Sequence, residues 1–312
     1  MEFLNLAPSE DAAAANVDLL QECLAACRLH DVELHVWKVA WNMGNHTPEP
    51  YRRLMREAGR TQLQADGQPT DYLAPHLVEN VDLEVAAWLE IAANYPVAGL
   101  HLDYIRYPDA ACDFSPSARE AFEAALGRKV SAWPDDCLEN GCDFEAYGAW
   151  RRANVTRLVR RLSRELQLFY PDVKLSAAVY GNWPNACVTV AQDADDWVRH
   201  GYLDFICPMN YEKDPELFAR WTKEQKKAIG GRIPFYPGIG TFLLSDAAEC
   251  TGQVLQSRKL GGDGFVLFQH GAALAGQVLP QLSAGVASQR VPLDKLPHHG
   301  QRRRIQIGRA HV

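Results

Sequence analysis

The sequence predicts an α/β fold, a parallel barrel of strands and helices from which two strands are missing. Strand and helix signals alternate along the 312 residues of the chain, and this alternation is typical of repeated βα units. Hydrophobic residues make up 47% of the chain, which is enough to bury a substantial core. The strand signals cover residues 33–40, 99–103, 174–180, 203–209, 233–238 and 264–269.

Each predicted strand is preceded by an amphipathic helix whose apolar residues recur every three to four positions. These helices cover residues 17–30, 83–94, 147–170, 193–200, 217–229 and 247–259. A closed barrel of this kind needs eight strands, and no spare apolar run supplies the other two. The opening residues EFLNLAP read as the tail of a loop. We therefore expect Met1 to be an internal methionine of a longer protein.

Two long loops and a distinct tail complete the organisation of the chain. The loops, residues 42–80 and 109–145, both follow strand ends, where substrate-binding insertions belong. After residue 284 the pattern dissolves into Pro, His and Arg, and the final letters IGRAHV are what a sequencing-adapter string encodes. We expect residues 1–284 to form one barrel domain and residues 285–312 a non-native or disordered tail. A natural basic tail is the alternative.

Charge and composition exclude several classes of partner. The net charge of −7 argues against a broad nucleic-acid surface, since basic residues cluster only at 302–304. No run of eighteen apolar residues is present to span a membrane, and the N-terminus has no signal-peptide pattern. The partner is therefore expected to be uncharged. Of the eight cysteines, Cys137 and Cys142 flank a short loop and either form a bridge or remain free thiols.

Nucleotide, serine-hydrolase and metal motifs are absent from the sequence. It contains no GxxxxGK[ST] or strand-linked GxGxxG, no GxSxG nucleophile elbow and no HExxH. We therefore expect no cofactor and no metal ion.

The most informative segment is GLHLDYIRYP at residues 99–108. Leu100 and Leu102 alternate with His101 and Asp103, so a strand would turn the leucines to one face and the polar pair to the other. In a parallel barrel the leucine face packs on helices, and the last inward residue opens at the rim where barrel active sites lie. The sequence therefore places Asp103 at such a rim.

Taken together, the motifs make the chain resemble the "family 10 glycosylhydrolase-like" proteins, which differ from the xylanases that share the number. The similar segments lie at 33–42, 99–108, 150–159, 174–184, 202–211, 235–240 and 264–271. The resemblance implies a (β/α)8 TIM barrel of glycoside-hydrolase type, usually exported, that hydrolyses glycosidic bonds. The chain departs from the family by lacking the first two strands.

Glycoside hydrolysis ordinarily needs two carboxyl groups, one to protonate the leaving oxygen and one to attack carbon or activate water. By analogy with related barrels, Asp103 is the candidate nucleophile, with a purely hydrogen-bonding role as the alternative. Glu212 follows the strand at 203–209 and is the candidate acid, although it lies outside the family motif. Asp204 begins that strand and is expected to be structural.

Aromatic rings cover the apolar faces of sugars, and amide, imidazole and guanidinium groups bind their hydroxyls. Residues of these types follow or end the predicted strands, with plain core packing as the alternative for each. The candidate substrate-binding residues are His35, Trp37, Trp41, Asn42, His101, Tyr104, Arg106, Tyr107, Arg152, Tyr180, Asn182, Trp183, Asn210, Tyr211 and Gln269. Arg152, and Asn154 two positions later, are candidates because they lie in a segment that is similar to the family.

The sequence thus predicts a glycosidase acting on a poly- or oligosaccharide. A non-catalytic carbohydrate-binding barrel and a barrel hydrolase of another substrate class remain alternatives. We expect Asp103, Tyr104, Arg106, Asn182, Tyr211 and Glu212 to converge at one barrel end. We also expect six paired strands with a gap between the first and the last.

Overall fold

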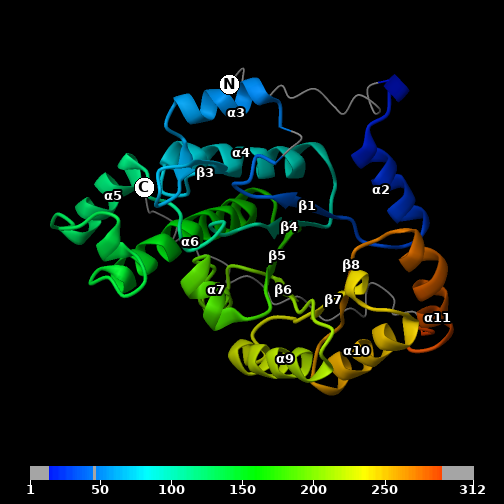
Figure 1. The fold of residues 1–312 in the computed structure, drawn as a ribbon. Coiled ribbons are helices and arrows are strands. Elements are labelled where there is room, and N and C mark those ends of the chain that lie inside the picture. The colour runs from blue at the N-terminus through cyan, green and yellow to red at the C-terminus, as the bar shows by residue number, and fades with distance from the viewer. Residues whose placement is uncertain (1–13, 45–46, 290–312) are drawn as a thin grey trace, which may run out of the picture.

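The computed structural model describes residues 14–44 and 47–289. Its centre is a curved sheet of parallel strands in which neighbours in space follow one another along the chain (Figure 1). The parallel strands are β1 (His35–Val39), β4 (Gly99–Asp103), β5 (Lys174–Tyr180), β6 (Phe205–Met209), β7 (Gly238–Gly240) and β8 (Val266–Phe268). The sheet orders are β1-β4-β5-β6 and β7-β8, and a parallel bridge between Ile206 and Phe235 joins the two.

Helices surround the strands on the outer side, as in a barrel (Figure 1). They are α2 (Leu19–Leu29), α3 (Glu49–Glu57), α4 (Val78–Asn94), α5 (Pro116–Leu126), α6 (Phe144–Phe169), α7 (Trp183–Thr189), α8 (Ala194–Arg199), α9 (Pro215–Ile229), α10 (Ala247–Lys259) and α11 (Leu279–Ala284). Among the helices of the described residues, none is both long enough and apolar enough to cross a bilayer.

The main core lies between the sheet and the outer helices. Leu100 and Leu102 of β4 are fully buried there, in the same apolar cluster as Trp88 of α4 and Leu158 of α6. Lys38 of β1 also points outward and pairs with Glu84 of α4, with 2.7 Å between Nζ and Oε2. The alternation predicted for the strand at 99–103 is therefore confirmed.

The barrel is partial. In the part of the chain that the structure describes, β1 pairs with β4 only and β8 pairs with β7 only. The two strands therefore form the ends of the curved sheet, as the gap in the predicted pattern required. The opening letters EFLNLAP and residues 290–312 of the predicted tail lie outside the described residues.

The two predicted loops contain more structure than the sequence indicated. Residues 42–80 hold α3 and a hairpin of β2 (Thr61–Leu63) and β3 (Pro69–Leu73), and residues 109–145 hold α5 and the 3-10 turn Asp135–Cys137. A bridge between Gln64 and Cys112 joins the two insertions. Contacts between distant segments stabilise these elements, which is why local patterns missed them.

The strand predicted at 233–238 is also displaced. Residues 234–236 follow β6, where Ile206 donates to the Pro234 carbonyl and Tyr236 donates to the Ile206 carbonyl. The regular strand β7 starts only at Gly238, after Pro237, and it pairs with β8. Prolines have no N–H to donate to a ladder, so they divide this strand into two short pieces.

Candidate active site at the carboxyl ends of the strands

Asp103 ends strand β4 on the inner side of the sheet. Its Oδ2 accepts a hydrogen bond from Trp37 Nε1 at 3.1 Å, and its Oδ1 accepts one from the Tyr104 backbone N–H at 2.7 Å. Arg106 Nη1 lies 3.5 Å from Oδ1. About a tenth of the Asp103 side chain is exposed. The carboxylate is thus held by two hydrogen-bond donors and one ion pair, and it still reaches solvent at the rim.

The register of the sheet explains why Trp37 and Asp103 meet. In the parallel pair β1 and β4, Trp37 lies opposite His101, and Asp103 is the next inward residue beyond it. Tyr104 has a positive φ of 51°, which turns the chain sharply out of the strand. This turn brings the N–H of Tyr104 back onto the carboxylate that precedes it.

Arg106 is a buried cation between two aromatic rings. Its guanidinium carbon lies 4.1 Å from the ring centre of Tyr104 and 4.6 Å from that of Tyr180, which ends β5. Cation–π contacts of this kind fix a guanidinium in place. The predicted residues Asp103, Tyr104, Arg106 and Tyr180 therefore do come together.

Tyr72 of the β3 strand belongs to the same group, although the sequence did not single it out. Asn42 donates a hydrogen bond to its hydroxyl at 3.3 Å. Burial raises the pKa of Tyr72, and the charges of Tyr104 and Arg106 also act on it. A residue inside a presumed loop gave no strand-end signal, so only the folded hairpin reveals it.

Tyr211 brings the far side of the sheet to the site. Its ring stacks on Phe268 of β8, with 5.3 Å between centres and 10° between planes, and meets Phe242 edge-on at 5.8 Å. Burial and the nearby Asp103 carboxylate raise the pKa of the Tyr211 hydroxyl. It therefore stays protonated and able to donate a hydrogen bond. Phe242 and Phe268 were not predicted as site residues.

The two inward histidines lie deeper in the barrel. His101 Nδ1 is 2.8 Å from Ser176 Oγ, and burial lowers the pKa of His101 to about 4. His35 contacts Glu33 at 3.1 Å and lies edge-on to the Phe205 ring, and burial lowers its pKa as well. Both imidazoles are neutral at pH 7. The hydrogen bond of His101 is to Ser176, which favours the core-packing alternative for this residue.

Glu212 is turned toward its own loop. Its Oε1 accepts hydrogen bonds from the backbone N–H groups of Lys213 at 2.9 Å and Asp214 at 3.4 Å, just before α9. Its backbone carbonyl accepts from Gln253 of α10. The free N–H groups before the helix therefore hold the Glu212 carboxylate in this structure. None of its hydrogen bonds joins it to Asp103.

Three predicted aromatic site residues are core residues instead. Trp41, Tyr107 and Trp183 have exposures of 1%, 0% and 6%. The backbone N–H of Trp41 donates to Glu84 Oε1 at 2.9 Å, and the Arg151 guanidinium lies over the Tyr107 ring at 4.4 Å. The sequence placed these rings beyond strand ends, but the insertions and α7 fold over them.

Asn210 is also a structural residue rather than a rim residue. It is fully buried and exchanges two hydrogen bonds with Gln225 of α9, at 2.9 and 2.7 Å. Its Nδ2 also lies 3.2 Å from Thr222 Oγ1. The amide therefore fixes the end of β6 to α9.

The contacts of the remaining predicted residues are with residues other than Asp103. Asn182 caps α7 by accepting from the Asn185 N–H, and Arg152 contacts the Cys187 carbonyl at 3.4 Å. Gln269 is exposed and, together with Phe242, lines a cavity of about 270 Å³. Asn154 is buried and accepts a hydrogen bond from Arg157. The expected convergence therefore holds only in part.

Comparison with known proteins shows which family this chain is similar to. The sequence model of the family described as "Glycosyl hydrolase-like 10" matches residues 2–239. The chain is 22% identical over 262 residues to glycosyl hydrolase DigH of Escherichia coli, covering 74% of this chain and 56% of that protein. It is 23% identical over 271 residues to glycosyl hydrolase YngK of Bacillus subtilis, covering 74% and 48%. The chain thus spans about half the length of these curated relatives.

Two solved structures share the fold. The glycoside hydrolase domain of PgaB (BpsB) from Bordetella bronchiseptica superposes with a TM-score of 0.60 at 13% identity, covering 80% of this chain and 74% of that chain. The catalytic domain of β-amylase from Paenibacillus polymyxa gives a TM-score of 0.58 at 12% identity, covering 80% and 79%. At these identities the likeness establishes the fold, a TIM barrel that is partial in this chain.

Proposed function

Because this chain belongs to the glycosyl hydrolase-like 10 family, we propose that it is a glycoside hydrolase acting on a poly- or oligosaccharide. The observation that supports this most is the environment of Asp103. Its carboxylate stands at the carboxyl end of an inner strand and is held by Trp37, Tyr104 and Arg106. Active sites of parallel barrels lie at this end of the strands.

In this proposal Asp103 attacks the anomeric carbon or activates the water that does so. The Trp37 N–H and the Arg106 guanidinium fix the carboxylate in one orientation, so little reorganisation is needed during the reaction. The protonated hydroxyl of Tyr211 is placed to donate a hydrogen bond near Asp103, to the sugar or to the carboxylate.

Exposed rings near the strand ends supply the carbohydrate-binding surface. Trp37 is 54% exposed, Tyr180 38% and Phe242 57%. Such rings cover the apolar faces of sugars, while Asn42 and Tyr72 offer polar groups for their hydroxyls. The site has no excess of one charge, which suits an uncharged glycan.

The proposed mechanism also needs a carboxylic acid that protonates the leaving oxygen. Glu212 remains our candidate, and it would have to leave the N–H groups of Lys213 and Asp214 to reach a bound sugar. The turned position of Glu212 favours one alternative function, a barrel that binds carbohydrate without cleaving it. Export from the cytoplasm is part of the proposal on family grounds alone.

The deciding experiment is a glycan screen of the protein and its Asp103→Asn variant, with product release and binding measured separately. A glycosidase releases reducing sugar from at least one glycan, and the variant binds that glycan but releases none. Binding without release by the unchanged protein would instead select the carbohydrate-binding alternative. Neither binding nor release on any glycan would contradict both.

A further inference from the structure

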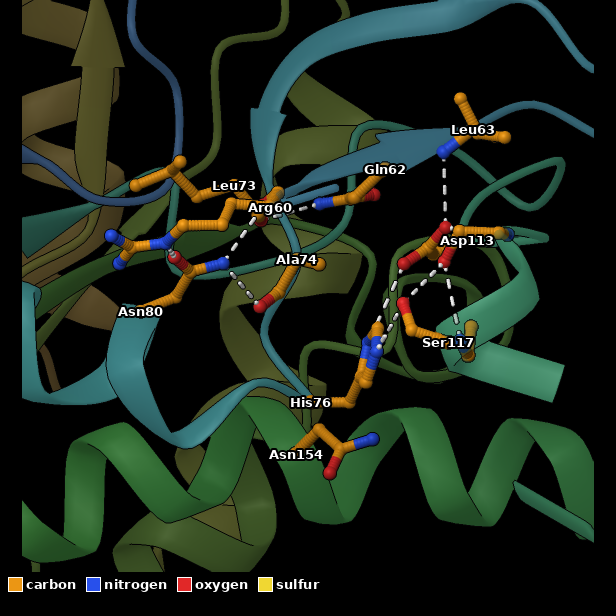
Figure 2. Close-up of polar contacts among 12 residues, drawn as sticks. Arg60, Gln62, Leu63, Leu73, Ala74, His76, Asn80, Asp113, Ser117 and Asn154 are labelled. Atoms are coloured by element: carbon orange, nitrogen blue, oxygen red, sulfur yellow. Dashed lines mark hydrogen bonds and ion pairs between the residues drawn. The ribbon is translucent and has the colours of Figure 1, made fainter. Parts of the chain in front are cut away.

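A second polar cluster lies outside the barrel, between the hairpin and helices α5 and α6. His76 Nε2 is 3.1 Å from Ser117 Oγ, and His76 Nδ1 is 3.4 Å from Asp113 Oδ2. Figure 2 shows the imidazole between the carboxylate and the hydroxyl, one on each ring nitrogen. The three side chains come from the segment after β3, the loop before α5 and the first turn of α5.

The exposure of the three side chains rises from one end of this cluster to the other. The side chain of Asp113 is 0% exposed and that of His76 2% exposed, whereas Ser117 is partly exposed. In serine hydrolases a buried carboxylate orients an imidazole, and the imidazole activates a serine hydroxyl that a substrate can reach. The three side chains of this cluster follow the same order. The reactive end is therefore the end that a substrate can reach.

Contacts with Asp113 bear on the proton positions of the cluster, although the 3.4 Å contact between His76 Nδ1 and Asp113 Oδ2 is not a hydrogen bond in this geometry. Asp113 Oδ1 accepts from the backbone N–H groups of Leu63 at 3.0 Å and Ser115 at 2.9 Å, which stabilise the ionised carboxylate. Burial nevertheless raises the pKa of Asp113 to about 6, and burial lowers the pKa of His76 to about 4. At pH 7 the acid is ionised and the imidazole is neutral.

An ionised carboxylate can only accept hydrogen bonds, so the proton of neutral His76 belongs on Nδ1, which faces Asp113. His76 Nε2 then carries the lone pair that accepts the Ser117 hydroxyl proton. This tautomer is the one that a general base for serine needs.

Packing holds the imidazole in place from the opposite side. Arg157 of α6 donates to the His76 carbonyl at 3.2 Å, and the Trp150 ring lies 5.6 Å from the imidazole. Ser117 itself lies in the first turn of the eleven-residue helix α5, capped by Ser115. Ser117 thus lies near the positive end of the helix dipole.

We propose that Ser117, His76 and Asp113 form a nucleophilic triad that hydrolyses carboxylic esters, at a site separate from Asp103. The Ser117 oxygen forms a bond to the acyl carbon while its proton passes to His76 Nε2. The ester C–O bond breaks, and the leaving alkoxide takes the proton from His76. Water then attacks the acyl-serine with His76 as base, which releases the carboxylic acid and restores Ser117.

No local sequence motif predicts this nucleophile, because Ser117 does not lie in a GxSxG elbow. The three residues span 76 to 117 and meet only when the two insertions fold together. A triad is recognised by its geometry and its roles rather than by sequence position.

The direct test is labelling of the whole protein with a fluorophosphonate, followed by peptide mass spectrometry. In this reaction the Ser117 oxygen bonds to phosphorus, fluoride leaves and the hydroxyl proton moves to His76. We expect one label per chain, located on Ser117, and none on the Ser117→Ala variant. Ser117 is partly exposed, so its alanine variant should fold normally, as circular dichroism can check.

Ser131→Ala provides the matched control, because Ser131 is exposed and none of the hydrogen bonds found among the described residues joins its side chain to Ser117, His76 or Asp113. We expect this control to be labelled at a rate within about threefold of the unchanged protein. Asp113→Asn and His76→Gln should lower the labelling rate on the order of 100-fold, the typical value of a general base.

The outcomes separate a catalytic cluster from a merely structural one. A folded, unchanged protein that takes up no fluorophosphonate would overturn the proposal, as would labelling of another serine. Equal labelling of folded His76→Gln would do the same. If the His76 and Asp113 variants fail to fold, loss of p-nitrophenyl acetate hydrolysis in Ser117→Ala but not in Ser131→Ala supports the triad, and equal hydrolysis by both refutes it.

Discussion

Trp37 Nε1 donates a 3.1 Å hydrogen bond to Asp103 Oδ2 across the neighbouring strands β1 and β4. This bond joins an exposed aromatic ring near the strand ends to a carboxylate that is about a tenth exposed. It gives Trp37 two separable roles, an apolar surface for sugar and an orienting donor for Asp103.

Asp103→Asn keeps the shape of the side chain and removes its charge. If Asp103 reacts with the sugar, turnover should fall by at least about 100-fold while the dissociation constant for glycan changes little, because the loss lies in the transition state. Steady-state kinetics and calorimetric binding measure the two effects. Exposed Asp172, before β5, supplies the matched control as Asp172→Asn. Unchanged turnover of Asp103→Asn would remove its catalytic role.

Trp37→Phe retains an aromatic ring and removes the N–H that reaches Asp103. We expect kcat to fall by roughly 10-fold with KM nearly unchanged, corresponding to about 1.4 kcal/mol in the transition state. Trp37→Ala should in addition raise KM, because the ring itself is lost. The thermal melting temperature should stay close to that of the unchanged protein in both variants, since Trp37 is 54% exposed. A kcat of Trp37→Phe equal to that of the unchanged protein would mean that the hydrogen bond has no role.

Asn210→Ala should destabilise the fold without touching a sugar. The change leaves the buried amide of Gln225 without its partner, which costs about 1–3 kcal/mol of the free energy of unfolding. Urea unfolding followed by circular dichroism measures this loss. Asn185→Ala, whose side chain is exposed on α7, should change the free energy by less than about 0.5 kcal/mol. Equal stabilities of the two variants would contradict the structural role of Asn210.

His101 should make the fold sensitive to acid. Its pKa is lowered by burial from 6.5 to about 4, so the unfolded chain binds the proton more readily than the folded one. Between pH 6.5 and 4 the stability must therefore fall as pH falls, by up to about 3 kcal/mol from this group. Unfolding titrations of the unchanged protein and of His101→Gln should diverge across this window. Parallel curves would show that His101 is not the buried neutral group described here.

Part of this structure could be predicted from the sequence, for reasons that particular elements show. Strands β4 and β5 and helix α10 have the predicted bounds, because their apolar periodicity is local and uninterrupted. The partial barrel and the family resemblance are confirmed as well. Tyr104, Arg106 and Tyr180 were predicted to share a rim because parallel strands end on one side of a sheet.

The rest depends on contacts between distant segments. The β2–β3 hairpin pairs Asn42 with Tyr72 and Gln64 with Cys112, and no local pattern encodes either bridge. The same insertions cover Trp41 and Tyr107, which a strand-end rule alone assigns to the rim. The Glu212 side chain, in turn, follows the nearest free N–H groups, a preference that becomes visible only once the loop geometry is known.

The fixed position of Arg106 determines how ligand affinity at the site depends on ionic strength. Because its guanidinium is fixed between two rings at 3.5 Å from the Asp103 carboxylate, the site presents a fixed dipole with no net charge. A neutral ligand approaching such a dipole displaces no counter-ions, and salt screens mainly interactions between separated net charges. Affinity for a neutral glycan should therefore stay nearly constant from dilute buffer to molar salt, whereas Arg106→Gln would leave a bare negative site that attracts cations.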